Sequence, residues 1–387
     1  MNEVPAQKPK IYFSNLDGIR FLCFFAVFCF HSIHSDNHKI YSSVFFIFLK
    51  ERLFANGYLG VNFFFVLSGF LITYLLIKEK QLNGRINVPN FWIRRILRIW
   101  PLYIVCVFIG FFLFPLMKSF VGDAGNETAD FWHYLFFAAN FDYIHKGMPD
   151  APGLSVLWSI AVEEQFYLVW PLLLSIIPIK RYWIAFAVIL AGSWVYRALH
   201  NSPVADAHFK PHEMHTFSCI GDMAMGAFGA WLSIVNKKCF HYFKLMPRVI
   251  IFFAYALFFL FLFFRQDIFI NNPYLRIFER SILALAIIII ILEQCFAETS
   301  YFKMSGLKKI TQLGVVTYGL YCIHFIIISL VTAISKKFGL DAHLWQVIIL
   351  QPVISLVITI GLSLLSYKYF ELPFLKLKNR FAYIVKE

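Results

Sequence analysis

Charged residues are scarce in this chain of 387 residues. They make up 15% of the sequence, whereas soluble globular domains average about 25%. Hydrophobic residues reach 60% and aromatic residues 19%, and the mean hydropathy is +0.68. This composition excludes a soluble domain, a disordered chain and a secreted disulfide scaffold. The sequence therefore predicts a polytopic membrane protein.

Paired cysteine motifs are also lacking. The seven cysteines lie in or next to apolar runs and form no C-x-x-C pair, so neither a disulfide framework nor a zinc site is indicated. No metal is expected. The first apolar run contains Arg20 and His31 and is followed by no small-residue cleavage site, so we expect a retained first span rather than a signal peptide.

About ten segments approach the 20 mostly apolar residues that a membrane-spanning helix needs. The predicted fold class is all-α, a polytopic membrane bundle of about ten transmembrane helices. The tract at 131–141 (FWHYLFFAANF) is too short to span, and we expect it to lie in the interface or to re-enter. The expected spans are 17–35, 57–77, 97–117, 155–177, 182–200, 214–235, 248–264, 280–297, 312–334 and 344–367.

The net charge of +13 is explained by membrane topology without any nucleic acid. With the N-terminus placed in the cytoplasm, 22 of the 35 lysines and arginines fall in inside segments and 12 in outside loops. This asymmetry follows the positive-inside rule and predicts that both termini are cytoplasmic. No linker, repeat or soluble appendage is visible, so we expect a single membrane domain over residues 1–387, with its core at about 15–373 and no fused soluble domain.

Arg20 and His31 share the first expected span. They are eleven residues apart, close to three full helical turns, so they lie on one face about 16 Å apart. Neutral histidine can accept a proton at physiological pH, which makes His31 a candidate general base, whereas Arg20 offers only charge and donors. The alternative is a snorkelling arginine and a packing histidine.

The tract FWIRRILRIWPLY places Arg94, Arg95 and Arg98 at the start of the third expected span, on the cytoplasmic side. Guanidinium clusters bind phosphate in a fork geometry. Basic residues at a cytoplasmic helix end are more often topology anchors that contact lipid head groups.

Two adjacent carboxylates, Glu163 and Glu164, lie inside the apolar tract SVLWSIAVEEQFYLVWPLL. Charge inside a membrane is costly, so such residues are functional candidates. Ser159, Glu163 and Tyr167 recur at four-residue spacing and share a polar stripe. The rise of a helix puts Glu163 about 12 Å deep, near the depth expected for His31.

Asp222 and His324 complete the set of polar residues inside expected spans. Asp222 lies in IGDMAMGAFGA, where small residues allow close helix packing, so a structural hydrogen bond is favoured at least as much as a catalytic role. His324, in TYGLYCIHF, is either a core histidine or a second polar residue that lines the site.

Together these motifs resemble the integral-membrane acyltransferase 3 family, the O-acetyltransferases of surface polysaccharides. LDGIRFLCFFAVFCFH, with Arg20 and His31 as R-x(10)-H, resembles the family's opening, and GVNFFFVLSGFLIT resembles its second-span signature. FWIRRILRIWPLY, LWSIAVEEQFYLVWP, TYGLYCIH and YFELP continue the resemblance over nearly the whole chain, in order. One departure is Thr317 and Gly319, where serines are common in the family.

The resemblance implies transfer of an acyl group, commonly acetyl from acetyl-CoA or another short acyl-CoA, across the membrane to a hydroxyl of an extracytoplasmic glycan or lipid-linked sugar. It implies that His31 and Glu163 are catalytic and that the arginines bind the coenzyme. It also implies a bacterial inner (plasma) membrane, with membrane lipids, the acyl-CoA and the glycan as partners. The residues with expected coenzyme-binding roles are Arg20, Arg94, Arg95 and Arg98, and those with supporting roles are Ser159, Tyr167, Asp222 and His324.

Two other functions remain open from the sequence. Polar residues in a bundle of many spans also line the paths of secondary transporters and exporters. A purely structural subunit of a glycan assembly complex is the third hypothesis. Transport without coenzyme A after removal of His31 would favour the transporter, and unchanged function in alanine variants of His31 and Glu163 would favour the structural subunit.

Overall fold

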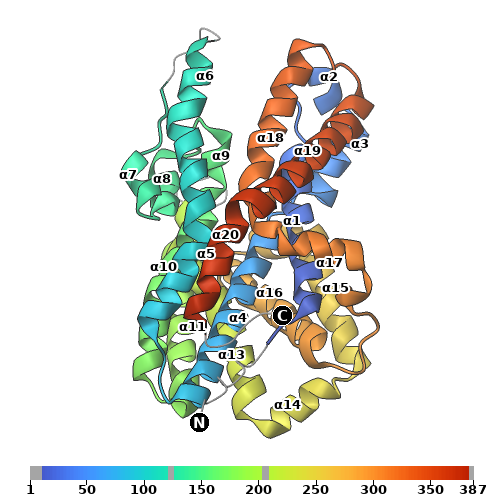
Figure 1. The fold of residues 1–387 in the computed structure, drawn as a ribbon. Helices are drawn as coiled ribbons and strands as arrows, with labels where there is room; N and C mark the ends of the chain where they lie inside the picture. Colours follow the sequence, from blue (N-terminus) through green and yellow to red (C-terminus); the bar gives the residue numbers. More distant parts are fainter. Residues whose placement is uncertain (1–10, 121–125, 203–208, 383–387) are drawn as a thin grey trace.

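The structure is a computed structural model that describes residues 11–120, 126–202 and 209–382. Every element in these ranges is helical, and they contain no β-strand, which confirms the expected all-α class. The long helices gather into a bundle, with α14 at one end and the short helices α2, α3 and α6 at the opposite end (Figure 1).

Each of the ten expected spans overlaps one long helix. Helix α5 begins well before the expected position 97, and α16 begins before position 280. The ten helices are α1 (Ser14–Ser32), α4 (Leu59–Asn83), α5 (Val88–Phe108), α10 (Leu157–Ile176), α11 (Tyr182–Leu199), α13 (Thr216–Val235), α15 (Arg248–Arg265), α16 (Pro273–Phe296), α18 (Thr317–Lys337) and α19 (Gln351–Ser366).

Seven helical stretches of the described residues are long and apolar enough to cross a membrane. Helices α1, α10 and α16 lie outside this set, and they carry charged residues such as Arg20, Glu163 and Arg280. The count of ten spans and the cytoplasmic location of both termini stay predictions. The seven stretches are Leu59–Asn83, Val88–Ser119, Ile179–Leu199, Pro211–Val235, Arg248–Ile270, Thr317–Lys337 and Gln346–Phe381.

Shorter helices connect and extend the long ones. The short α-helices are α2 (His38–Tyr41), α3 (Val44–Phe48), α6 (Phe114–Phe120), α7 (Phe131–Leu135), α8 (Ala139–Lys146), α9 (Pro152–Ser155), α12 (Phe209–Met214), α14 (Lys237–Lys244), α17 (Lys308–Val315) and α20 (Leu372–Lys378). Single π-helical turns cover Leu49–Leu53, Ile109–Leu113, Gln266–Ile270, Gln346–Leu350 and Tyr367–Glu371, and 3₁₀ turns cover Ile179–Arg181, Met304–Gly306 and Asn379–Phe381.

The tract at 131–141 does not form one long helix. It is divided between α7 and α8, and Phe137 between them adopts a positive φ of 55°. This agrees with the expectation that the tract is too short to span.

The start of α5 corrects the expected position of the arginine cluster. The side chain of Asn87 accepts a hydrogen bond from the backbone N–H of Asn90, and Pro89 lies in the first turn. Both features favour a helix start here. Arg94, Arg95 and Arg98 therefore lie inside a continuous helix rather than at its first turn.

Helices α4 and α13 cross at backbone contact distance. A Cβ atom at Gly226 would lie 1.9 Å from the carbonyl oxygen of Val66, and one at Gly69 would lie 2.0 Å from that of Met223. Only glycine allows this approach, as expected for small residues at helix interfaces within membranes. The close packing expected around Asp222 is confirmed, and it fixes α4 at the centre of the bundle.

The apolar core is divided into clusters that meet at one aromatic ring. The larger two centre on α5 with α10, and on α15 with α16, and a third joins α1 to α18. Phe64 of α4 packs against all three. A polar cavity lies beside this ring.

Candidate active site

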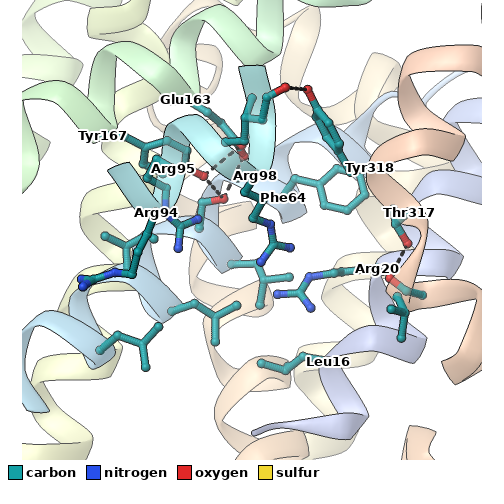
Figure 2. A pocket seen from close by; sticks show the side chains of 18 of the residues that line it. Leu16, Arg20, Phe64, Arg94, Arg95, Arg98, Glu163, Tyr167, Thr317 and Tyr318 are labelled. Carbon is teal, nitrogen blue, oxygen red and sulfur yellow. Dashed lines mark hydrogen bonds between the residues drawn. The ribbon is translucent and has the colours of Figure 1, made fainter. Parts of the chain in front are cut away.

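A cavity of about 290 Å³ lies between α1, α4, α5, α10 and α18. Residues 11–13, before α1, and residues 378, 379 and 382, at and after the end of α20, also line it. Residues from opposite ends of the described sequence therefore form its wall. Figure 2 shows the polar side chains that face this space.

Four arginines line the cavity, and they differ in their partners. Arg94 forms an ion pair with Glu79 at 3.0 Å and donates to the carbonyl oxygen of Phe381 at 2.8 Å. Arg20 is paired with Asp17. Arg95 and Arg98 form no hydrogen bond or ion pair with any described residue. Two guanidinium groups are thus available to an anionic ligand.

Aromatic rings hold Arg95 in place. Its guanidinium carbon lies 5.2 Å from the centroid of Tyr167 and 5.5 Å from that of Phe91. Cation–π contacts of this kind stabilise a cation without neutralising it. Arg98 extends into the cavity, where Figure 2 shows its guanidinium group beside that of Arg20.

Glu163 is the acidic residue that lines the cavity among the described residues. Its Oε1 accepts a hydrogen bond of 2.8 Å from Ser68, and its Oε2 lies 3.0 Å from the hydroxyl of Tyr167. The predicted stripe of Ser159, Glu163 and Tyr167 does line one wall. Ser68 was not singled out from the sequence, although it is a polar residue within an apolar run.

Glu164 faces a different neighbour, as expected for adjacent helical positions about 100° apart. Its Oε2 accepts a hydrogen bond of 2.9 Å from the indole N–H of Trp100. Its Oε1 is buried and has no hydrogen-bond partner among the described residues. Glu164 does not line the cavity, so Glu163 is the carboxylate that could meet a ligand there.

His31 and His324 lie beyond the cavity wall and contact each other. Nδ1 of His31 is 3.0 Å from Nε2 of His324. Nδ1 of His324 is 2.7 Å from the carbonyl oxygen of Tyr321. The hydroxyl of Tyr321 is 2.7 Å from Oγ of Ser159, and both of these residues line the cavity. Tyr321, which the sequence did not single out, therefore connects the histidine pair to the cavity.

At the opposite side of the cavity, Tyr12 fixes the partner of Arg20. Its hydroxyl donates to Oδ2 of Asp17 at 2.6 Å. Burial, followed by this hydrogen bond, raises the pKa of Tyr12 to about 12. Tyr12 therefore stays protonated at physiological pH and keeps Asp17 oriented toward Arg20.

Asp222 belongs to a separate ionic network. Its Oδ2 accepts a hydrogen bond of 2.6 Å from Arg280 and one of 3.0 Å from Asn62. The network is continued by buried ion pairs between α11, α12, α15 and α16, and none of its members lines the cavity. Its other members are Arg197, Glu213, Arg265 and Glu279.

Part of this network has the composition of a metal site. The ligand atoms of His212, Glu213 and Glu279 lie within 4.8 Å of one another. Glu279, however, already accepts hydrogen bonds from Arg197 at 3.0 Å and from Arg265 at 2.6 Å. Arginine supplies the positive charge that a cation would bring, so the geometry is that of an ion-pair network.

Comparisons with known proteins bear on what the cavity does. A family model described as an acyltransferase domain matches residues 13–368. No solved structure matches the chain significantly.

Three similar proteins come from bacteria. The peptidoglycan O-acetyltransferase of Listeria monocytogenes is 26% identical over 94% of this chain and 56% of its own length. A Bacillus subtilis protein provisionally named a peptidoglycan O-acetyltransferase is 24% identical over 94% of this chain and 55% of its own. A Staphylococcus aureus protein provisionally named an O-acetyltransferase is 33% identical over 46% of this chain and 28% of its own. The chain spans about half, or less, of the length of these relatives.

Proposed function

The chain belongs to the acyltransferase family whose model covers residues 13–368, and we propose that it is a multi-pass membrane enzyme that transfers an acyl group from acetyl-CoA to a hydroxyl of a cell-envelope glycan. A glycan acceptor is supported by the relatives whose names include peptidoglycan O-acetyltransferase. Their bacterial origin supports a plasma-membrane location. Another short acyl-CoA could serve as the donor by the same chemistry.

The observation that carries this proposal is the unpaired state of Arg95 and Arg98 in the cavity. Guanidinium groups bind phosphate through charge-assisted hydrogen bonds. Coenzyme A carries a pyrophosphate and a further phosphate on its nucleotide. A donor without phosphate would leave these two arginines without an ion-pair partner in the cavity.

The size of the cavity decides which part of the donor enters it. At about 290 Å³ it lies just below the range of small-molecule pockets, about 300 to 1,000 Å³. The whole coenzyme is too large for this space. We therefore place the pantetheine arm deepest in the cavity, the phosphates at Arg95 and Arg98, and the adenosine end at the mouth, near Arg94 and Lys378.

The proposed chemistry takes place where the cavity wall meets the histidine pair. The acceptor hydroxyl oxygen attacks the thioester carbonyl carbon, and His31 takes the hydroxyl proton. The C–S bond then breaks, and the coenzyme A thiolate receives that proton from the His31 imidazolium. A brief acyl-His31 intermediate is the alternative route, and trapping such a species would distinguish the two.

Glu163 lies on the cavity wall with both oxygens held by hydroxyl groups. A carboxylate in this position accepts hydrogen bonds, so we assign it to binding the acceptor or the amide groups of the pantetheine arm. Glu163 bonds Ser68 and Tyr167, whereas the hydrogen-bond partner of His31 is His324.

The test is mass spectrometry of surface glycans from a deletion strain. The strain is complemented with the wild type, His31→Ala or Arg95→Ala, with membrane abundance matched. An acyl mass increment that appears only with the wild type supports the proposal and identifies the acyl group. Equal glycans from all three strains would contradict it and would favour the transporter.

A further inference from the structure

The hydrogen bonds of the histidine pair determine which nitrogen of His31 carries a proton. Nδ1 of His324 lies 2.7 Å from the Tyr321 carbonyl oxygen, and a carbonyl only accepts. Nδ1 of His324 must therefore carry the proton. A neutral imidazole has one donor and one acceptor nitrogen, so Nε2 of His324 is the acceptor.

The same reasoning extends to His31 across the 3.0 Å contact between its Nδ1 and Nε2 of His324. Because the His324 nitrogen accepts, Nδ1 of His31 donates. Nε2 of His31 is then left with a free lone pair, which is the state that a general base needs.

We propose that His324 is a positioning residue that holds His31 in the tautomer with its proton on Nδ1 and its base lone pair on Nε2. The inference rests on the proposed function, in which His31 takes the proton of the acceptor hydroxyl. It adds a specific requirement: His324 must present a hydrogen-bond acceptor to His31.

The packing around the pair keeps this arrangement fixed. His324 is fully buried, and the ring of Phe24 contacts it edge-on with centroids 5.7 Å apart. The ring of Phe325 stacks on His31 at 4.5 Å. The ring contacts hold the two ring planes, and a half-turn flip of either imidazole would put carbon in place of its bonded nitrogen and break the hydrogen bond between the rings.

Tyr321 ties this arrangement to the cavity. Its backbone carbonyl orients His324, while its hydroxyl contacts Ser159, four residues before Glu163 on α10. Once His31 has accepted a proton on Nε2, its Nδ1–H still donates to His324. This hydrogen bond stabilises the His31 imidazolium during acyl transfer. Other acyl transfer enzymes also place a hydrogen-bond acceptor behind the catalytic histidine.

The test combines NMR with kinetics on the full-length protein in detergent. The wild type, His324→Phe and His324→Gln are labelled with ¹⁵N-histidine, and His31→Gln assigns the His31 signals. Phenylalanine keeps the ring shape without an acceptor, whereas the glutamine oxygen can accept from Nδ1 of His31. His343→Phe, in an exposed loop, is the matched control.

We expect Nδ1 of His31 to be protonated and Nε2 unprotonated in the wild type and in His324→Gln. We expect a mixture of tautomers in His324→Phe. Turnover should fall about 100-fold or more in His324→Phe, because general base catalysis contributes about 10²- to 10⁴-fold. The KM for acetyl-CoA should stay unchanged, and His324→Gln should recover to within about 10-fold of the wild type.

A proton on Nε2 of His31 in the wild type would overturn the inference, and this needs no variant to fold. A wild-type tautomer and wild-type turnover in His324→Phe would overturn it as well. If the expected tautomers appear but His31→Gln retains full turnover, the tautomer assignment is supported and the proposed role of His31 as the base fails.

Discussion

Ser68 on α4 donates a hydrogen bond of 2.8 Å to Glu163 on α10. The second carboxylate oxygen is 3.0 Å from the hydroxyl of Tyr167. Glu163 is therefore held by neutral hydroxyl groups rather than by an arginine, although Arg95 lies in the same cavity. This separation of partners leaves the guanidinium group of Arg95 available to a ligand.

Removing the Ser68 hydroxyl should loosen Glu163 without removing its charge. Hydrogen bonds to charged groups contribute about 1.5 to 3 kcal/mol, so we expect Ser68→Ala to lower kcat/KM at least about 10-fold, the equivalent of about 1.4 kcal/mol. Steady-state kinetics with purified protein measures this. Ser175→Ala, near the end of α10, is the control, and unchanged kcat/KM in Ser68→Ala would show that Tyr167 alone orients the carboxylate.

Arg98 should bind the phosphates of the donor. We expect Arg98→Ala to raise the KM for acetyl-CoA about 10-fold or more, because charge-assisted hydrogen bonds to phosphate are lost. The KM for acetyl-pantetheine, which lacks phosphate, should be unchanged. Arg85→Ala, in an exposed turn, provides the control. Equal effects on both donors would place Arg98 at the thioester end instead.

Asp222 should contribute to stability rather than to catalysis. Asp222→Asn leaves the buried Arg280 without its 2.6 Å carboxylate partner, and loss of one member of a buried ion pair costs about 3 to 5 kcal/mol. Thermal unfolding followed by fluorescence should show a lower midpoint, while turnover per folded molecule stays at the wild-type value. A normal midpoint with lost turnover would instead assign Asp222 to the chemistry.

The crossing of α4 and α13 should tolerate no side chain at Gly226. A Cβ atom there would meet the backbone of Val66 at 1.9 Å, so Gly226→Ala should strongly reduce the yield of folded protein, measured by size-exclusion chromatography in detergent. Gly192→Ala and Gly361→Ala are matched controls, because a Cβ at either position has no neighbour within 4 Å. A folded Gly226→Ala protein would mean that the helices can separate without loss of the bundle.

The charge distribution predicts which end of the bundle faces the cytoplasm. Cys239 on α14 is free and partly exposed, so a membrane-impermeant maleimide should label it only after cells are permeabilised. Lys39→Cys, near the opposite end on α2, should be labelled in intact cells. The reverse pattern would invert the predicted topology.

Arg20 and Glu163 could be singled out from the sequence because charge within apolar runs is costly and therefore conspicuous. Arg94, Arg95 and Arg98 were more often expected to be topology anchors, and the structure places them on the cavity wall. Helical periodicity also placed Ser159, Glu163 and Tyr167 on one wall, where the structure has them. Periodicity defines faces along a helix, but it does not define which helix each face meets. Helical rise therefore put Glu163 and His31 at similar depths, whereas the structure pairs His31 with His324.

Other residues of the cavity wall and of the ionic network could not be singled out from the sequence. Ser68 and Tyr321 are neutral and common in membrane helices, so their hydroxyl groups become notable only when their partners are known. The network of Arg197, Glu279 and Arg280 lies near the ends of expected spans, where charged residues are ordinary. Its burial depends on how α11, α13 and α16 pack, which their separate sequences do not specify.

The wall of the cavity has a consequence for biosynthesis. Residues 11–13 and residues 378, 379 and 382 face the same space, and Arg94 is held by the carbonyl of Phe381. A nascent chain inserts its helices in order, so this site is completed only when the segment after α20 folds back against α5. A partly synthesised chain therefore lacks a finished cavity, and under the proposed function it would not consume donor thioester before the bundle is assembled.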